Sequence, residues 1–210
     1  MTQSTEAIPV SAIILTYNEQ ANIRSCIAGL AWCDEVIIVD SGSDDDTVNL
    51  ARAMRSDVRV FENSFEDFGQ QRNWALDNTH PRNQWVLFVD ADELCTEEFY
   101  AEVGQFIKET DCVGGYIAGR NYFMGKWLKH STMFPSYQLR LLRIGEVRYE
   151  KAGHGQREVV DGKLAYLKEG WRHESFSKGV AEWIARHNNY STQEVILILK
   201  LRQEKMQWFD

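Results

Sequence analysis

The chain has 210 residues, of which 44% are hydrophobic and 26% charged, a composition typical of folded globular proteins and unlike that of disordered ones. Lys and Arg number 23 against 31 Asp and Glu, so the formal net charge is −8 and nucleic-acid binding is not expected as the main function. The polar N-terminus predicts no secretory signal, and no apolar run approaches the roughly 20 residues of a membrane-spanning helix. Because the four Cys form no Cys-x-x-Cys pair, we expect a reduced, cytoplasmic protein.

Short apolar runs alternate with helical patterns over the first half of the chain. Strands are predicted near residues 10–15, 36–39, 58–61 and 85–89, and helices near residues 23–30, 46–54, 68–76 and 96–107. Apolar strands that alternate with helices are typical of a parallel sheet covered on both faces. We therefore predict an α/β fold with a mostly parallel sheet.

The pattern changes after about residue 111. Short, partly alternating runs there predict antiparallel strands added to the sheet, near residues 114–118, 138–143, 146–149 and 163–167.

A helical pattern begins at Ser177. Four residues are predicted to share one face of this helix: Val180, Trp183, Ile184 and His187. Ser191 and Glu194 have the spacing of a capping box, which predicts a second helix from there through Lys205. We expect one compact unit followed by a helical C-terminal tail.

Polar side chains follow three of the predicted parallel strands. They are Thr16-Tyr17-Asn18-Glu19, Asp40-Ser41-Gly42-Ser43 and Asp90-Ala91-Asp92. Such residues are also common in turns and helix caps, so each group alone is ambiguous, but ligands of open parallel sheets bind at this edge. The two carboxylates of the third group are hard oxygen ligands that suit Mg²⁺ or Mn²⁺ beside phosphate.

In this order the three groups resemble the inverting family 2 glycosyltransferases, which have the GT-A nucleotide-diphospho-sugar transferase fold. Residues 40–47 resemble that family's D-x-G-S-x-D-x-T loop, and Asp90-Ala91-Asp92 resembles its D-x-D motif. Gly69-Gln70-Gln71-Arg72-Asn73, the Glu93 after the D-x-D motif and the run 173–190 look like the branch that includes lipopolysaccharide inner-core β-1,4-glucosyltransferases. The resemblance implies a GT-A domain at 1–176, with a nucleotide-binding half at about 8–110 and an acceptor half at about 111–176, and a C-terminal helical extension at 177–210.

The resemblance also implies which residues bind the donor and the metal. Those for the nucleotide-sugar are Thr16, Tyr17, Asn18, Glu19, Asp40, Ser41, Gly42, Ser43, Gln71, Arg72, Asp90, Ala91 and Asp92. In this set Asp40 would accept the uracil imide N–H, and Arg72 would pair with the diphosphate or orient the base loop. Asp90 would contact the ribose or the metal. Asp92 would ligate Mn²⁺ or Mg²⁺, with His173 as a further ligand and His154 as its substitute.

Transfer with inversion needs a carboxylate that takes the proton of the acceptor hydroxyl. By resemblance Glu158 is this base, although the polar face of a strand would explain it equally. The alternatives are Glu150, Asp161, Glu169 and Glu174.

Two residues are expected near the acceptor. Arg140 would neutralise an anionic acceptor, unless it only keeps an edge strand soluble. Trp127, with Lys126 and His130 in a predicted loop, would stack on a sugar ring.

The expected function is metal-dependent transfer of glucose from UDP-glucose to a heptose of the lipopolysaccharide inner core. A polyprenyl phosphate is the alternative acceptor, and a non-catalytic nucleotide- or Mg²⁺-binding regulatory module is the alternative of another class. The helical extension, with Lys200, Arg202 and Lys205 beside apolar residues, is expected to contact the inner membrane surface or to form a homodimer.

Overall fold

The computed structural model describes residues 7–130, 134–152 and 155–206. Its centre is a seven-stranded sheet with the strand order β12-β6-β9-β4-β1-β2-β3. These strands are β1 (Ile8–Thr16), β2 (Cys33–Asp40), β3 (Arg59–Glu62), β4 (Trp85–Asp90), β6 (Gly114–Ala118), β9 (Tyr137–Arg143) and β12 (Leu164–Tyr166). Neighbours are parallel except where β9 pairs with β4 and β6. The α/β fold with a mostly parallel sheet is as predicted.

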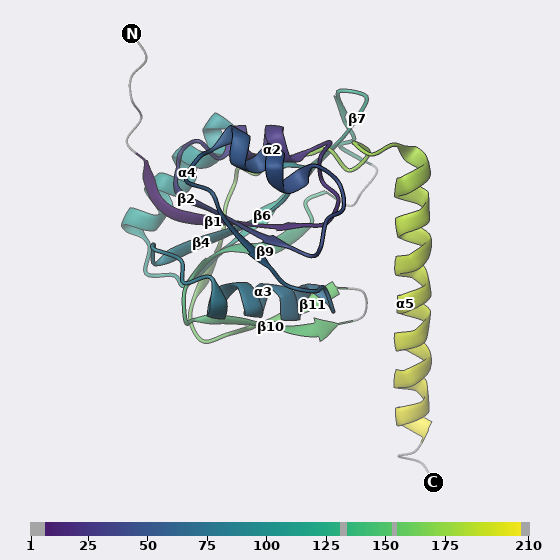
Figure 1. The fold of residues 1–210 in the computed structure, drawn as a ribbon. Helices are drawn as coiled ribbons and strands as arrows, with labels where there is room; N and C mark the ends of the chain where they lie inside the picture. Colours follow the sequence, from purple (N-terminus) through teal and green to yellow (C-terminus); the bar gives the residue numbers. More distant parts are fainter. Residues whose placement is uncertain (1–6, 131–133, 153–154, 207–210) are drawn as a thin grey trace.

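Helices cover both faces of this sheet (Figure 1). One face carries α1 (Ile23–Gly29), α2 (Thr47–Met54) and α4 (Glu97–Glu109), and the other carries α3 (Phe68–Asn78) with the hairpin of β10 (Val147–Ala152) and β11 (Gly155–Val160). Alternation along β1 sends Ile14 into the first core, with Phe99, and Ile13 into the second, with Phe88. Each such buried side chain stabilises the fold by about 1.5–3 kcal/mol.

A smaller sheet brings the second half of the chain to the end of β4. Its order is β5-β13-β7-β8, with β5 (Glu93–Leu94), β13 (Arg172–His173), β7 (Arg120–Phe123) and β8 (Lys126–Trp127). The pairing of β13 with β5 sets His173 opposite Glu93. Strands of two residues carry no periodic pattern, so the sequence contained no signal for them.

The C-terminal element is α5 (Val180–Met206), a single helix. The predicted restart at Ser191 is wrong, because its hydroxyl donates to the carbonyl of Asn188 at 2.9 Å within the continuing helix instead of capping a new one. Figure 1 shows α5 beside the body of the protein, running past the edge where the parallel strands end.

Because α5 is one continuous helix from Val180, the four residues predicted to share a face lie within about 100° of one another around its axis. The Trp183 ring stacks on Phe176 at a centroid distance of 5.1 Å and on His187 at 3.8 Å. Val180 and Ile184, which share this face, are 45% and 56% exposed.

Candidate functional site

The end of β2 and the loop after it are organised by one buried carboxylate. Asp40, which is 3% exposed, accepts hydrogen bonds from the hydroxyls of Thr16 and Ser43, both at 2.7 Å. It also accepts from the backbone N–H groups of Gly42 and Ser43, at 3.1 and 2.8 Å. Gly42 has φ +83°, a conformation that favours glycine, so the tight turn around the carboxylate depends on that residue. Four donors occupy Asp40, which holds the loop in one shape.

The loop after β1 interlocks with the loop after β2. The backbone N–H of Asn18 donates to the Ser43 hydroxyl at 2.8 Å, and that of Glu19 donates to Thr47 at 2.7 Å. Tyr17 is 59% exposed, so its ring presents a flat surface beside these loops. The two expected nucleotide loops therefore lie together.

The first turns of α3 lie behind these loops. Gln71, 1% exposed, donates to the hydroxyl of Ser41 at 3.1 Å. Arg72, 4% exposed, lies 5.4 and 5.6 Å from the ring centroids of Phe88 and Tyr149, and its Nε has no hydrogen-bond partner among the described residues. Burial lowers the pKa of Arg72 to about 10. The guanidinium of Arg72 is therefore a buried group that borders the site from inside the core.

Asp90 ends β4 and forms a bidentate ion pair with Arg140. The guanidinium Nη1 and Nη2 donate to the two carboxylate oxygens at 2.9 and 2.6 Å, and Arg72 lies 3.7 Å away. Burial raises the pKa of Asp90, but the charge and hydrogen bonds of Arg140 outweigh it and hold that pKa well below its usual range.

This pairing corrects two expectations for Arg140. Its strand, β9, lies inside the sheet between β6 and β4 rather than at an edge, and the side chain is 3% exposed. Its donors are directed to Asp90, Gln138 and Glu93, so the structure gives it partners within the site instead of an acceptor.

Glu93 is a site residue to which the sequence analysis assigned no role. Its carboxylate, 4% exposed, accepts from the backbone N–H of Asp90 at 2.8 Å and lies 3.5 Å from Arg140. Burial raises the pKa of Glu93 to about 7, although Arg140 opposes this shift. The sequence contained one signal for a buried carboxylate such as Glu93. Arg140 is a charged residue in an apolar strand, and such a residue requires a buried counter-ion.

Asp92 and His173 face each other across the β5–β13 pairing. His173 Nε2 lies 3.3 Å from Asp92 Oδ2, with the side chains 30% and 12% exposed. Burial lowers the pKa of His173, but the hydrogen bond and charge of Asp92 and the charges of Glu93 and Asp90 outweigh it and raise that pKa to about 9. The two expected metal ligands are therefore brought together. His154, the expected substitute, lies outside the described residues.

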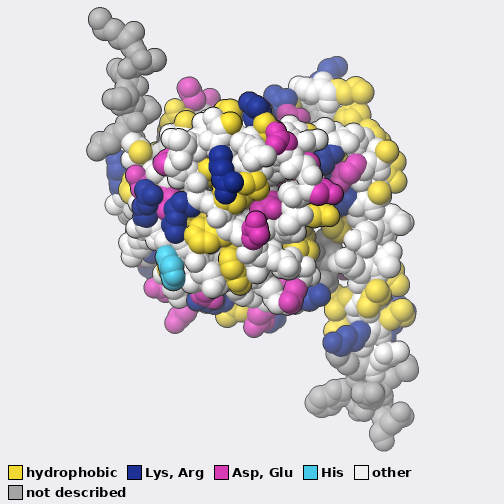
Figure 2. Space-filling view, viewed as in Figure 1, with side chains coloured by type: hydrophobic (Ala, Val, Ile, Leu, Met, Phe, Trp, Pro, Cys, Tyr) yellow, Lys and Arg dark blue, Asp and Glu magenta, His cyan; other side chains and the backbone are white. Residues whose placement is uncertain are grey.

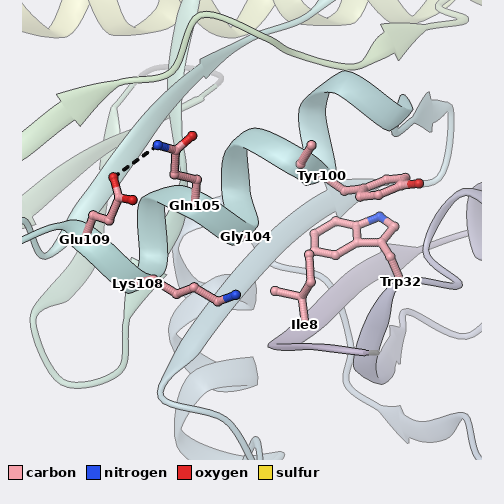
Figure 3. A pocket seen from close by; sticks show the side chains of 8 residues that line it. Ile8, Trp32, Tyr100, Gly104, Gln105, Lys108 and Glu109 are labelled. Carbon is pink, nitrogen blue, oxygen red and sulfur yellow. Dashed lines mark hydrogen bonds between the residues drawn. The ribbon is translucent and has the colours of Figure 1, made fainter. Parts of the chain in front are cut away.

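A cavity of about 240 Å³ adjoins Asp92. Its lining residues are Asn22, Ser25, Ala91, Asp92, Leu94, Glu174 and Ser177. A larger cavity of about 440 Å³ lies beside α4 and the start of β1, where Trp32 stacks on Tyr100 (Figure 3). That cavity is at the opposite end of the parallel strands, so we place the chemistry at the smaller one, which contains a site carboxylate.

The expected base comes from a different sheet than His173 and the strands that flank Asp92. Glu158 lies on β11 opposite Tyr149 of β10, and within the described residues no hydrogen bond or ion pair joins it to Asp92 or His173. It is nevertheless close to the sheet: burial raises the pKa of Tyr149 to about 12, and the negative charge of Glu158 contributes to that rise.

Trp127 is on β8 rather than in a loop. Its ring faces the guanidinium of Arg120 at 5.8 Å and the ammonium of Lys129 at 5.7 Å, and its edge meets Phe134 at 5.1 Å. These contacts use ring surface that the expected sugar stacking requires.

Tyr190 of α5 is a further residue near the site that the sequence analysis missed. Burial raises the pKa of Tyr190, and the charges of Asp90 and Asp92 raise it further. A chain of ring contacts leads to it from Phe176 through Trp183 and His187. The first half of α5 therefore packs on the segment before it, within electrostatic reach of the carboxylates at the end of β4.

Over the residues that the structure covers, no helix combines the length and apolar character needed to cross a bilayer.

Comparison with known proteins identifies the family. The family model described as glycosyl transferase family 2 matches residues 11–170. The lipopolysaccharide core biosynthesis glycosyltransferase LpsC of Rhizobium meliloti (strain 1021) is 28% identical over 190 residues, which cover 88% of this chain and 70% of LpsC. The SPbeta prophage-derived glycosyltransferase SunS of Bacillus subtilis (strain 168) is 30% identical over 107 residues, 48% of this chain and 25% of SunS.

Solved structures give the same fold. The crystal structure of S. aureus TarS 1-349 has a TM-score of 0.58 and 19% identity, and covers 79% of this chain and 60% of TarS 1-349. Its complex with UDP has a TM-score of 0.59 at 18% identity. The GT-A fold expected from the sequence is thereby confirmed. With a family model that matches most of its length, this chain belongs to glycosyl transferase family 2.

Proposed function

We propose that this chain is an inverting, metal-dependent glycosyltransferase that moves a sugar from a UDP-sugar to a glycan. The observation that carries the proposal is the meeting of three loops at one sheet edge, where the ordered Asp40 loop lies near the Asp92–His173 pair. A nucleoside diphosphate has the matching chemistry, with a base at one end and an anionic group that needs a cation at the other.

The nucleoside would bind at the interlocked loops after β1 and β2. Asp40 would accept the uracil imide N–H in exchange for the hydroxyl of Ser43, which is the most easily reoriented of its four donors. Tyr17 supplies an exposed ring for stacking. Gln71 would keep Ser41 in place, and Asp90, one of whose sides faces solvent, would contact the ribose.

Asp92 and His173 fit a divalent cation. One carboxylate and one imidazole suit Mn²⁺ or Mg²⁺, and within the described residues no group of three or more such side chains is assembled. Two protein ligands are sufficient where phosphate oxygens and water complete the coordination. When bound, the cation would neutralise the diphosphate as it leaves.

Glu158 would take the proton from the acceptor hydroxyl while that oxygen attacks the anomeric carbon of the donor and the bond to the diphosphate breaks. Cross-strand pairing places Glu158 on the same hairpin face as Tyr149, whose ring packs against Phe88 of β4. Glu150, on the opposite hairpin face and paired with Arg157, is not supported as the base.

The donor and acceptor are inferred from the relatives. LpsC is named for lipopolysaccharide core biosynthesis, and TarS has been crystallised with UDP and with UDP-GlcNAc. We propose a UDP-hexose, with glucose first, and a heptose of the lipopolysaccharide inner core, on the cytoplasmic side of the inner membrane. A polyprenyl phosphate is the alternative acceptor.

The second half of α5 supports contact with a membrane surface. Its exposed aliphatic residues are Val195, Ile196, Ile198, Leu199 and Leu201. At 100° per residue these five spread over an arc of roughly 220°, so the exposed apolar surface of this half is broader than the single stripe of an amphipathic helix. Figure 2 shows hydrophobic side chains and a basic one on this projecting part of the helix. We propose that the second half of α5 enters an anionic lipid surface. The alternative is that a second copy of the chain covers its apolar side chains.

A donor and acceptor panel tests the proposed function. UDP-glucose, UDP-galactose and UDP-GlcNAc would each be incubated with a heptose-terminated inner-core glycan or a polyprenyl phosphate, with Mn²⁺ or Mg²⁺, and UDP release and the mass of the acceptor measured. We expect UDP release coupled to one added hexose on the heptose glycan. Metal or UDP binding without release or transfer would instead indicate a regulatory module.

A further inference from the structure

Two arginines near the site, Arg140 and Arg172, each interact with more than one partner. Arg140 is committed to Asp90, Glu93 and Gln138. Arg172 is paired with Glu174 and lies over the ring of Tyr122, with its guanidinium carbon 4.3 Å from the ring centroid. Neither can move to a ligand without leaving a buried carboxylate or an aromatic partner behind.

Lys178 differs from these arginines. Among the residues that the structure describes, its ammonium makes one ion pair, with Glu19 at 2.6 Å, and the two side chains are 26% and 19% exposed. Lysine is a compact charge on a flexible stem, so its ammonium can exchange one anionic oxygen for another with little change of backbone.

The position of Lys178 is central to the proposed donor site. Its segment is tied to the end of β4, since the backbone N–H of Glu174 donates to the carbonyl of Asp92 at 2.8 Å. Glu19, its partner, follows β1 and also accepts from Asn22 at 2.7 Å. Asn22, Asp92 and Ser177 all line the 240 Å³ cavity. The ammonium therefore contacts the loop proposed for the base, and the segment that carries it is bonded to the residue proposed for the metal.

Charge supports an anionic ligand at this point. Burial raises the pKa of Glu19, the Lys178 hydrogen bond lowers it, and the negative charge of Asp92 raises it, which places all three groups within electrostatic reach. Burial raises the pKa of Asp45, in the loop after β2, but hydrogen bonds from Thr47 and from the backbone N–H of Gln20 outweigh it and lower that pKa, with a smaller contribution from the charge of Lys178. A diphosphate that entered among these carboxylates would be repelled unless a cation besides the metal faced it.

We propose that Lys178 binds the diphosphate of the donor, leaving Glu19 when the nucleotide enters. This inference rests on the proposed function and adds to it a binding residue outside the three motifs. Glu19 would then occupy the ammonium until phosphate oxygens replace it, and its ion pair keeps the segment that carries Lys178 next to the loop after β1.

Nucleotide affinities test the proposal. Uridine and UDP binding, with Mn²⁺ present, would be measured by calorimetry and ligand-observed NMR for the native chain and for Lys178→Met, Glu19→Gln and the double variant. Lys163→Met is the matched control, because Lys163 forms an exposed ion pair with Asp111 at 2.5 Å. We expect Lys178→Met to weaken UDP binding at least about tenfold, the worth of one charge-assisted hydrogen bond, and to leave uridine within twofold.

The double variant distinguishes direct binding of the diphosphate by Lys178 from an indirect effect, in which loss of Lys178 leaves the Glu19 carboxylate unpaired. With Glu19 neutral, loss of Lys178 should still weaken UDP binding relative to Glu19→Gln alone. Native affinity for UDP in Lys178→Met, an affinity of the double variant equal to that of Glu19→Gln, or an equal loss for uridine and UDP, would overturn the inference. A native chain that binds neither ligand would instead overturn the proposed function.

Discussion

At the scale of single residues, three carboxylates at the site are each paired with a basic side chain. Asp90 pairs with Arg140 and Asp92 with His173, while Glu19 pairs with Lys178. Repulsion among these acids would otherwise favour protonation or local unfolding. The pairing of Asp90 with Arg140 is bidentate and Arg140 is buried, so Asp90 is the most firmly held. The pair of Asp92 and His173 is open to a cation that replaces the histidine's proton.

Asp92 is the residue on which the metal proposal depends most. We predict that Asp92→Asn abolishes Mn²⁺-dependent transfer and leaves the melting temperature nearly unchanged, because the amide keeps a hydrogen bond to His173 but loses the charge that binds the cation. Activity and thermal melting would be measured together. Asp77→Asn, in an exposed ion pair with Arg148, is the control. Full activity of Asp92→Asn would refute the metal assignment.

Glu158 carries the proposed proton transfer. We predict that Glu158→Gln lowers kcat by about 10²-fold or more with little effect on donor affinity, because a base acts on the acceptor proton only in the transition state. The control is Glu150→Gln, on the opposite face of the same hairpin. Steady-state kinetics and donor titrations distinguish the outcomes. If donor binding collapses instead, Glu158 is structural, and Asp161 or Glu174 becomes the candidate base.

At the scale of elements, one carboxylate joins the starts of three neighbouring strands. Glu35 of β2, 1% exposed, accepts from the Ser11 hydroxyl of β1 at 2.6 Å and forms an ion pair with Arg59 of β3 at 2.8 Å. It also accepts from the backbone N–H of Arg82, just before β4, at 2.8 Å. These bonds fasten the edge opposite the site, so they affect stability rather than chemistry.

The pKa of Glu35 makes this fastening dependent on pH. Burial raises its pKa, but the bonds from Ser11, Arg82 and Arg59 outweigh burial and hold it below the usual value of 4.5. Because the folded pKa is depressed, the stabilisation is present above about pH 4.5 and is lost as pH falls through the folded pKa. We predict that Glu35→Gln costs about 1–3 kcal/mol at pH 7 and less at pH 3. Urea unfolding at both pH values, with Glu62→Gln at the exposed end of β3 as control, tests this; an equal loss at both would contradict it.

Local sequence patterns predicted the strands, helices and loops of the first half of the chain. They could not predict which distant residues complete the site. Apolar strands that end in Asp40 and Asp90 are local signals, so the loops of the site were predictable residue by residue. The partner of Asp90 comes from β9, and His173 comes from a strand of two residues, contacts that only the folded sheet defines. The Ser191 spacing misled because a serine hydroxyl inside a helix can bond to the preceding turn instead of capping a new one.

At the scale of the whole molecule, α5 has two structurally different halves. The first half packs back on the preceding segment, since Trp183 stacks on Phe176 and Arg186 donates to the carbonyl of Ser175. Lys178, just before the helix, reaches Glu19. The boundary expected near residue 176 stays a prediction, since these contacts cross it. The second half extends away from the body with apolar side chains exposed (Figures 1 and 2). Exposed aliphatic residues in such number call for a partner surface.

An anionic membrane is the partner that we predict for this second half. Lys200 and Arg202 would each contribute about 1 kcal/mol near an anionic surface, in addition to the burial of the aliphatic side chains. The native chain should co-sediment with vesicles that contain phosphatidylglycerol, less so in high salt. Ile196→Glu with Leu199→Glu should stay in the supernatant. Gln193→Glu with Gln203→Glu adds the same charge to the helix while keeping its apolar residues, so it should still bind measurably.

Sedimentation velocity without lipid distinguishes membrane binding from dimerisation through the second half of α5. A lipid-binding helix leaves the chain monomeric in solution, whereas a helix covered by a second copy gives a dimer that Ile196→Glu with Leu199→Glu dissociates. If the native protein does not pellet with vesicles and forms such a dimer, the apolar half of α5 serves self-association instead. The proposed acceptor would then have to reach the site without help from this helix, because the exposed apolar surface would be used up within the dimer.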